Sequence, residues 1–202
     1  MPATRTKRRK KKRVNQQTLF LGAVLLVLVI VVIFSSLSGC SVSHGSAEKV
    51  VISLLKAYGN GKENLVKDCY GQKKETEESL QKQIDAMFTF LAAHDAKDIE
   101  VKACDELSSS GNTFCVYAIY GLVIDKDNTY PCLGTYMVQK DGGSYRILSP
   151  SEVTSSMQKT AANDFKKFMS TDTYKQYMVD YNTFIKKNPG YEERIQTKLG
   201  GI

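Results

Sequence analysis

The sequence is poor in the residues from which active sites are usually built. Its 202 residues include two histidines and no tryptophan. It has no nucleophile elbow, phosphate-binding loop or zinc-protease helix motif. Acidic residues are absent from the first 18 positions, which hold eight of the 28 basic residues, so the rest of the chain carries 20 basic and 21 acidic groups. The net charge of +7 therefore belongs to the tail, which argues against a nucleic-acid-binding face on the folded part, since such domains are usually basic throughout.

A long apolar run follows the basic tail. Residues 19–34 read LFLGAVLLVLVIVVIF, and extension to Leu37 gives 19 residues, or about 28 Å of helix against the roughly 30 Å of a bilayer core. The block RTKRRKKKR at 5–13 precedes it, and cationic flanks stay cytoplasmic. We predict a cytoplasmic tail at 1–18, a transmembrane or signal helix at 19–39, and a linker at 40–46 that leads outward. A nuclear-localisation or nucleic-acid patch is the alternative interpretation of the basic block.

The end of the apolar run resembles a bacterial lipoprotein signal. Leu37-Ser38-Gly39-Cys40 matches the four-residue box, and the resemblance implies cleavage before Cys40 and acylation of its sulfur. The basic start and the apolar stretch are both longer than those of a usual cleavable signal. We therefore expect an uncleaved single-pass anchor, with lipidation of Cys40 as the alternative. In both cases the remaining chain is tethered outside the cytoplasm.

Hydrophobic periodicity predicts an α+β domain. Helical spacing of apolar residues predicts three helices, and period-two alternation then predicts four strands joined by short turns, which makes an antiparallel meander with helices on one sheet face. Further helices are expected to open at Ser151 and at Thr171 or Asp172. We predict helices at 47–58, 64–70 and from about 75 to 94, strands at 99–103, 114–124, 130–140 and 145–148, a last short helix at 191–199, and a division into a domain at 47–150 and a helical extension at 151–202.

Two stretches give this layout a family resemblance. They are SAEKVVISLLKAYGNGKENLVKDCYGQ at 46–72 and MVQKDGGSYRILSP at 137–150. Over residues 46–150 the chain resembles the nuclear-transport-factor-2-like, cystatin-like cone superfamily, in particular its membrane-anchored and lipoprotein bacterial domains of unknown function. It is also similar in layout to the bitopic inner-membrane subunit of type IV secretion systems. The resemblance implies a curved sheet that can enclose an apolar pocket, and it implies no particular activity.

Four cysteines follow Cys40, at positions 69, 104, 115 and 132. An even number in an outward-facing domain predicts two disulfides. A hairpin turning about Ser109–Ser110 would place Cys104 opposite Cys115, which leaves Cys69 to pair with Cys132. The rival pairings are 69–104 with 115–132 and 69–115 with 104–132, and four buried free thiols are the alternative to any pairing. No CxxC spacing is present, so no zinc site is expected.

Aromatic residues supply the candidate binding surfaces. A pocket in the cone would be lined by Tyr58, Phe88, Tyr117 and Tyr136, and the alternative is that these side chains fill the core. No carboxylate alternates onto the same strand face, so no general base is expected. The helix at 172–185 carries an aromatic stripe that either packs inward or meets a partner. Its members are Tyr174, Tyr177, Tyr181 and Phe184.

Together these features predict a bacterial, membrane-tethered, extracytoplasmic binding or assembly domain without catalytic activity. The expected partners are the lipid bilayer and another envelope protein or a second copy, with no nucleic acid, cofactor or metal. The first alternative is a lipoprotein that binds a small apolar ligand in the cone pocket. The second is an enzyme of the isomerase or dehydratase type.

Overall fold

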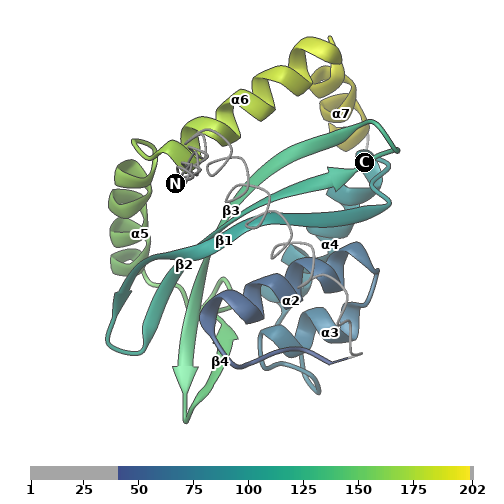
Figure 1. Ribbon diagram of the computed structural model, residues 1–202. Helices are drawn as coiled ribbons and strands as arrows, with labels where there is room; N and C mark the ends of the chain where they lie inside the picture. Colours follow the sequence, from purple (N-terminus) through teal and green to yellow (C-terminus); the bar gives the residue numbers. More distant parts are fainter. Residues whose placement is uncertain (1–40, 201–202) are drawn as a thin grey trace, which may run out of the picture. The chain divides into compact units, whose positions relative to one another are not determined.

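The structure is a computed structural model, and it describes residues 41–200 (Figure 1). The predicted tail, the predicted span at 19–39 and Cys40 lie outside the described residues. Among the helices of the described part, none is both long enough and apolar enough to cross a membrane. From Val42 onward the described residues form one compact unit.

Three helices begin this unit, as predicted. They are α2 (Ala47–Gly59), α3 (Glu63–Cys69) and α4 (Glu78–Ala93). The Ser46 hydroxyl caps α2 by accepting the Lys49 amide at 3.2 Å, and Glu48 lies in the first turn, where a carboxylate suits the helix dipole. Gly61 follows the helix with a φ of 64°, a conformation that glycine adopts without a steric penalty. The apolar face of α2 is almost fully buried.

A four-stranded sheet follows, in the predicted antiparallel order β1-β2-β3-β4. Its strands are β1 (Asp98–Ser110), β2 (Thr113–Val123), β3 (Thr129–Asp141) and β4 (Ser144–Ile147). The first strand is much longer than the predicted 99–103, because two irregularities in its register let it follow β2 to the hairpin end. Gly142 and Gly143, with φ values of 56° and 95°, form the last hairpin turn.

The sheet has a buried surface on each side. Val116, Ala118, Tyr120 and Leu122 of β2 belong to the core shared with α2, α3 and α4. Side chains alternate across a strand, so the odd-numbered residues of β2 face the other way. There Tyr117 packs against Phe168, with ring centroids 4.3 Å apart. The three N-terminal helices thus lie on one face of the sheet, as expected for them.

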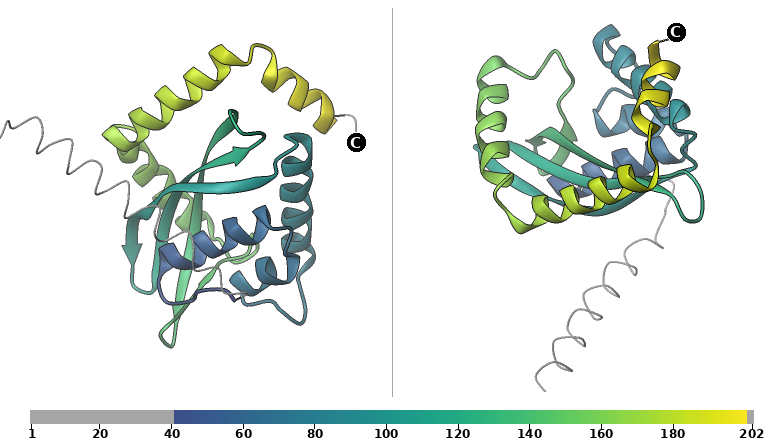
Figure 2. Two further views of the ribbon diagram at one scale, coloured as in Figure 1. Left: turned by 45° about the vertical axis from the view of Figure 1, so that its right-hand side comes forward. Right: turned by 90° about the horizontal axis from the view of Figure 1, so that it is seen from above.

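The opposite face is covered by α5 (Ser155–Phe168) and α6 (Asp172–Lys187), and the last helix, α7 (Tyr191–Gly200), lies beside α4. They follow one another around the sheet: α5 contacts β1, α6 contacts β3, and α7 returns to α4 (Figure 2). The predicted start at Ser151 is wrong. The helix begins at Ser155 because Thr154 is its cap, accepting the Met157 amide at 3.3 Å.

Candidate functional site

A hollow of about 470 Å³ lies between α5 and the part of the sheet formed by β3 and β4. This volume falls within the range typical of small-molecule sites. We call it the larger hollow, because a second one, of about 310 Å³, also borders α5. Its lining comes from the end of α3, from α4, from β3, from the exit of β4 and from α5, namely Tyr70, Gln83, Thr135, Tyr136, Met137, Ile147, Leu148, Pro150, Val153, Gln158, Ala161, Ala162 and Phe165.

The hollow exists because α5 packs loosely on the sheet. Of its 14 residues only Phe168, at the C-terminal end, is fully buried. Ala161 and Ala162 line the hollow from the middle of the helix, and each contributes only a methyl group. The hollow is a groove that is partly open to solvent and not a closed void in the packed interior.

The lining is apolar apart from a few uncharged groups. Its members include no carboxylate, imidazole, thiol or amine. Within it, the Gln83 side-chain amide donates to the Tyr70 hydroxyl at 3.4 Å. Burial raises the pKa of Tyr70 and of Tyr136 well above the ordinary value for a phenol. Both hydroxyls therefore stay protonated near neutral pH, so they serve as hydrogen-bonding groups and not as bases.

Gly134 determines where the Tyr136 side chain lies. A Cβ atom added at Gly134 would lie 2.9 Å from the Tyr136 hydroxyl oxygen and 3.1 Å from a ring carbon. The tyrosine ring thus covers the glycine on the same face of β3. A side chain at position 134 would displace the ring.

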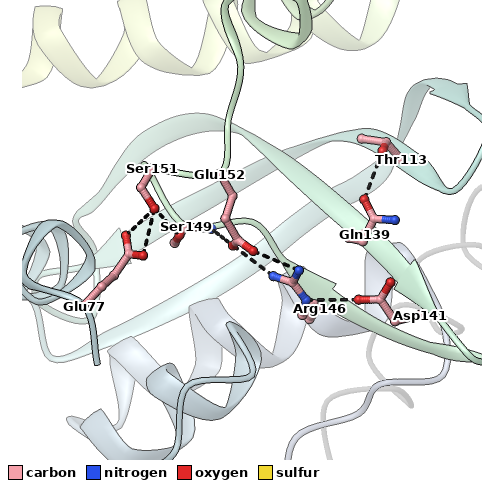
Figure 3. Close-up of polar contacts among 8 residues, drawn as sticks. All are labelled: Glu77, Thr113, Gln139, Asp141, Arg146, Ser149, Ser151 and Glu152. Carbon is pink, nitrogen blue, oxygen red and sulfur yellow. Dashed lines mark hydrogen bonds and ion pairs between the residues drawn. The ribbon is translucent and has the colours of Figure 1, made fainter. Parts of the chain in front are cut away.

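A polar network fixes the segment that connects β4 to α5 (Figure 3). The Arg146 guanidinium donates to both carboxylate oxygens of Glu152 at 2.9 Å and to Asp141 at 3.1 Å. Glu152 also accepts the Ser149 amide at 2.8 Å. These bonds hold the turn that precedes α5 in place. The N-terminal end of α5, which forms one wall of the larger hollow, is therefore fixed in place.

A second anchor joins this turn to the helical layer. The Ser151 hydroxyl contacts both carboxylate oxygens of Glu77, at 2.8 and 2.7 Å, just before α4 (Figure 3). Residues 74 positions apart in the chain are thereby connected. The turn is consequently held from the sheet and from the α4 side.

The four residues predicted to line one pocket do not lie together. Tyr117 lies opposite Thr135 in the ladder, so it occupies the sheet face opposite that of Tyr136. Tyr58 is 5% exposed and packs edge-on against Phe88, with ring centroids 5.3 Å apart. Only Tyr136 lines the larger hollow. Sequence patterns predicted a helix here but did not indicate that α5 lines a hollow, because its apolar pattern is weak.

The predicted bridge between Cys104 and Cys115 is wrong because the first hairpin turns later than expected. The turn includes Gly111, and β1 shifts twice against β2. Cys104 therefore lies opposite Ala118, while Cys115 lies opposite Ser108. A change of register by an odd number of residues moves a side chain to the other face.

Both rival pairings fail as well. Cys115 lies on the α5 side of the sheet. The Cys104 thiol, by contrast, approaches the Glu48 carbonyl of α2 at 3.7 Å, and Cys69 and Cys132 belong to the core on that side. Any scheme with two bridges would join Cys115 to a cysteine across the sheet. In residues 41–200 the cysteines are four free thiols, which agrees with the alternative of buried unpaired cysteines.

Burial makes these thiols poor nucleophiles. It raises the pKa of Cys69, Cys104 and Cys132 to about 12 and that of Cys115 to about 11. The reactive species of a cysteine is the thiolate, which these environments disfavour. Over the described part of the chain no group of three or more histidine, cysteine or acidic side chains could hold a metal ion.

The aromatic stripe of α6 packs inside the molecule. Tyr174 lies against Phe165 and Phe168 of α5, with ring centroids 6.1 and 5.8 Å apart. Phe184 is 6% exposed and meets Tyr130 of β3 edge-on at 5.2 Å. These contacts favour the inward-packing interpretation for both ends of the stripe.

The middle of the stripe meets α7. Tyr177 and Tyr181 are neighbours, with ring centroids 6.2 Å apart. The Tyr181 hydroxyl donates to Glu192 at 2.5 Å, and Tyr130 donates to the same oxygen at 3.0 Å. The stripe therefore fastens α6 and α7 to the sheet, which leaves little of it for a partner.

Both histidines make contacts that stabilise the fold. His94, at the end of α4, is 3% exposed and lies 2.8 Å from the Tyr191 hydroxyl. Burial, with the nearby charge of Lys198, lowers its pKa to about 4, so the ring is neutral at ordinary pH. His44 lies 2.7 Å from the Tyr145 carbonyl and 3.4 Å from an Asp68 carboxylate oxygen, which ties the residues before α2 to β4 and α3.

We compared the chain with protein-family models and with curated proteins. No family model matches it, and no curated protein matches it. Membership of the nuclear-transport-factor-2-like superfamily therefore remains a prediction. The function of the larger hollow has to be argued from its own residues.

Proposed function

We propose that the protein is a membrane-tethered extracytoplasmic binding domain without catalytic activity, and that the larger hollow binds a small, uncharged, mostly apolar ligand. The observation that carries the proposal is the hollow itself, about 470 Å³ with no ionisable side chain in its lining other than two tyrosines held protonated by burial. The lining is mostly apolar and offers a charged ligand no countercharge.

The same lining argues against an isomerase or dehydratase. Such a reaction needs a group that exchanges protons near neutral pH. Neither Tyr70 nor Tyr136 is such a group, because burial raises the pKa of both. The tether rests on the sequence alone, on the apolar run at 19–34 and the basic block before it.

Ligand binding is tested by filling the hollow. We expect a small molecule to co-purify with the full chain from its own membrane, and to be detected by mass spectrometry after extraction. Ala161→Trp, which adds a large ring at a partly buried position of the lining, should remove it. Lys159→Trp is the matched control, because it adds the same ring to an exposed position of α5 outside the lining.

The outcomes separate the alternatives. Loss of the molecule in Ala161→Trp and retention in Lys159→Trp supports the proposal. Equal amounts in both variants, or no molecule in the unmodified chain after added apolar compounds have also been offered, contradicts it. Thermal unfolding of both variants shows whether α5 still packs.

Topology is tested with an impermeant maleimide on intact cells. Lys126→Cys places a thiol in the exposed turn between β2 and β3, and the proposal expects it to react from outside. A thiol introduced by Thr4→Cys should react only after the membrane is permeabilised, or be missing if the signal is cleaved. Labelling at position 126 only after permeabilisation would contradict the extracytoplasmic location.

A further inference from the structure

We infer that the ligand of the larger hollow is a short, extended, apolar peptide that pairs with the open edge of β3 as an added strand. This inference rests on the proposed function and names the chemical class of its ligand. Three observations support it: the place where the hollow meets β3, the direction of the backbone groups there, and the nature of the walls on either side.

The larger hollow lies at an edge of the sheet. The pairing of β4 with β3 reaches Val138, and a bond from the Leu148 amide to the Met137 carbonyl, 2.8 Å long, ends the ladder. From this point the hollow is lined by Thr135, Tyr136 and Met137. Successive side chains of a strand point to opposite faces. A hollow that all three line therefore wraps around the edge of β3 where β4 has ended.

Backbone groups of β3 point into this space. The Met137 carbonyl points toward β4, whereas the Lys140 amide points the other way and donates to the Asn112 carbonyl, just before β2, at 2.8 Å. These directions alternate along an antiparallel strand, so the backbone groups of the odd-numbered residues of β3 face away from β2. Leu133 and Thr135 thus each present an amide and a carbonyl that have no hydrogen-bond partner within residues 41–200.

The position of Pro131 agrees with this direction. Proline has no N–H, and within a sheet it is confined to positions where the ladder does not need one. Pro131 lies opposite Gly121 inside the β2–β3 ladder, and it fits there because its nitrogen faces the edge without a neighbouring strand. Beyond it Tyr130 packs against Phe184 of α6. The open stretch therefore runs from about Leu133 to the end of β4.

The other edge of the sheet is protected against pairing. The pairing of β1 with β2 is shifted twice, and β1 carries exposed charged side chains. Proteins use both features to prevent strands from adding to a sheet edge. The charged residues are Glu100, Lys102, Asp105 and Glu106. Residues 133–137 of β3 include no charged side chain, so this edge lacks that protection.

The walls suit the alternating side chains of an added strand. Side chains on the same face as Thr135 would meet α5 at Ala161 and Phe165, and those on the same face as Tyr136 would meet Tyr70. No charged group lines these walls, so uncharged, apolar side chains fit both. A hydrocarbon of the same size would cover the free amides and carbonyls of β3 without bonding them, which is costly. A peptide backbone would bond them.

The probe is the blocked peptide acetyl-Ser-Val-Leu-Val-Ser-amide, which has no charged end and whose β-branched residues favour an extended backbone. It is added to the full chain in lipid nanodiscs, and hydrogen exchange is followed by mass spectrometry at single-residue resolution. With the peptide at about ten times its dissociation constant, the amides of Leu133 and Thr135 should exchange about tenfold more slowly. The same peptide with every amide N-methylated has no backbone donor, so it should give no protection.

Variants of Thr135 give the controls on the protein. Thr135→Pro removes the outward amide at an edge position of the kind that Pro131 already occupies, and it should weaken binding of the fluorescently labelled peptide by at least about fivefold. Thr135→Val keeps the amide and should bind the peptide within about twofold of the unmodified chain. Because Thr135→Pro could disturb β3, the N-methylated peptide provides a second test that leaves the protein unchanged.

The outcomes are distinguishable. Slower exchange at Leu133 and Thr135, lost with the N-methylated peptide, supports the inference. Equal binding of the two peptides overturns it, as does protection that appears without peptide and grows with protein concentration, since the occupant would then be a second copy. If no peptide binds while photoreactive octanol labels residues 147–165 and Ala161→Trp removes this labelling, the inference falls and the proposed function stands. Binding of neither probe overturns both.

Discussion

His94 should make the stability of the domain depend on pH in a narrow window. The ring is buried between α4, β3 and α7, with Tyr130 and Tyr191 against it. Burial is the main cause of its low pKa, and the cation of Lys198 adds to it, while Asp95 and Glu192 act in the opposite direction. The result is a pKa of about 4 in the folded protein.

In the unfolded chain a histidine has a pKa of about 6.5, which is higher than that of His94 in the folded protein. As the pH falls below that value, the unfolded chain binds a proton that the folded protein does not bind until about pH 4. Acid therefore favours unfolding in this window. Integration of the proton difference gives a loss of about 2 kcal/mol between pH 7 and pH 4.5, a substantial part of the stability of an ordinary domain.

The assay is urea unfolding of the full chain in a non-ionic detergent, followed by circular dichroism at several pH values. His94→Gln carries no titratable ring, so between pH 7 and pH 4.5 it should lose about 2 kcal/mol less than the protein that keeps His94. Carboxylates such as Glu152, whose pKa is lowered in the folded protein, lower the stability of both proteins equally near pH 4.5. Both proteins should carry His44→Gln, because His44 is the only other histidine. If the two proteins lose stability in parallel over this range, His94 is not held neutral in the folded state and the described packing of α7 is wrong.

Three further predictions concern the walls of the hollow and the thiols. Arg146→Gln should lower the unfolding free energy by about 1 kcal/mol, since its pair with Glu152 is partly exposed, and high salt should reduce the difference in urea unfolding. Gly134→Ala should destabilise by roughly 1 kcal/mol by displacing the Tyr136 ring, and thermal unfolding measures this. Without reductant, mass spectrometry of the denatured chain should show maleimide adducts on all four cysteines of the described part, and a mass two daltons low would instead reveal a bridge. These are Cys69, Cys104, Cys115 and Cys132.

The elements that sequence patterns predicted well are those fixed by local signals. The helix α2 has a cap, a first-turn carboxylate, an apolar face at helical spacing and a glycine after its end. The meander follows from three short connections between strands with period-two patterns. In each case the residues that determine the element lie next to one another in the chain, so no tertiary information was needed.

The features that sequence patterns missed depend on register and on docking. The first hairpin turns at Gly111 and Asn112 and not at Ser109–Ser110, and this later turn moved Cys104 away from Cys115. The bulges of β1 have no sequence signature either. The faces of Tyr117 and Tyr136 could be assigned only once the β2–β3 pairing was known. The larger hollow needs α5 to stand off the sheet, which depends on anchors such as Arg146 and Glu152 that lie outside the helix.

The most direct test of the account is a crystal structure of the full chain purified from its own membrane without removal of bound molecules. We expect density for a small, mostly apolar molecule in the larger hollow under α5, in contact with lining residues such as Ile147 and Phe165. A hollow closed by inward movement of α5, with Phe165 packed directly on Tyr136 and no space left for a ligand, would contradict the account.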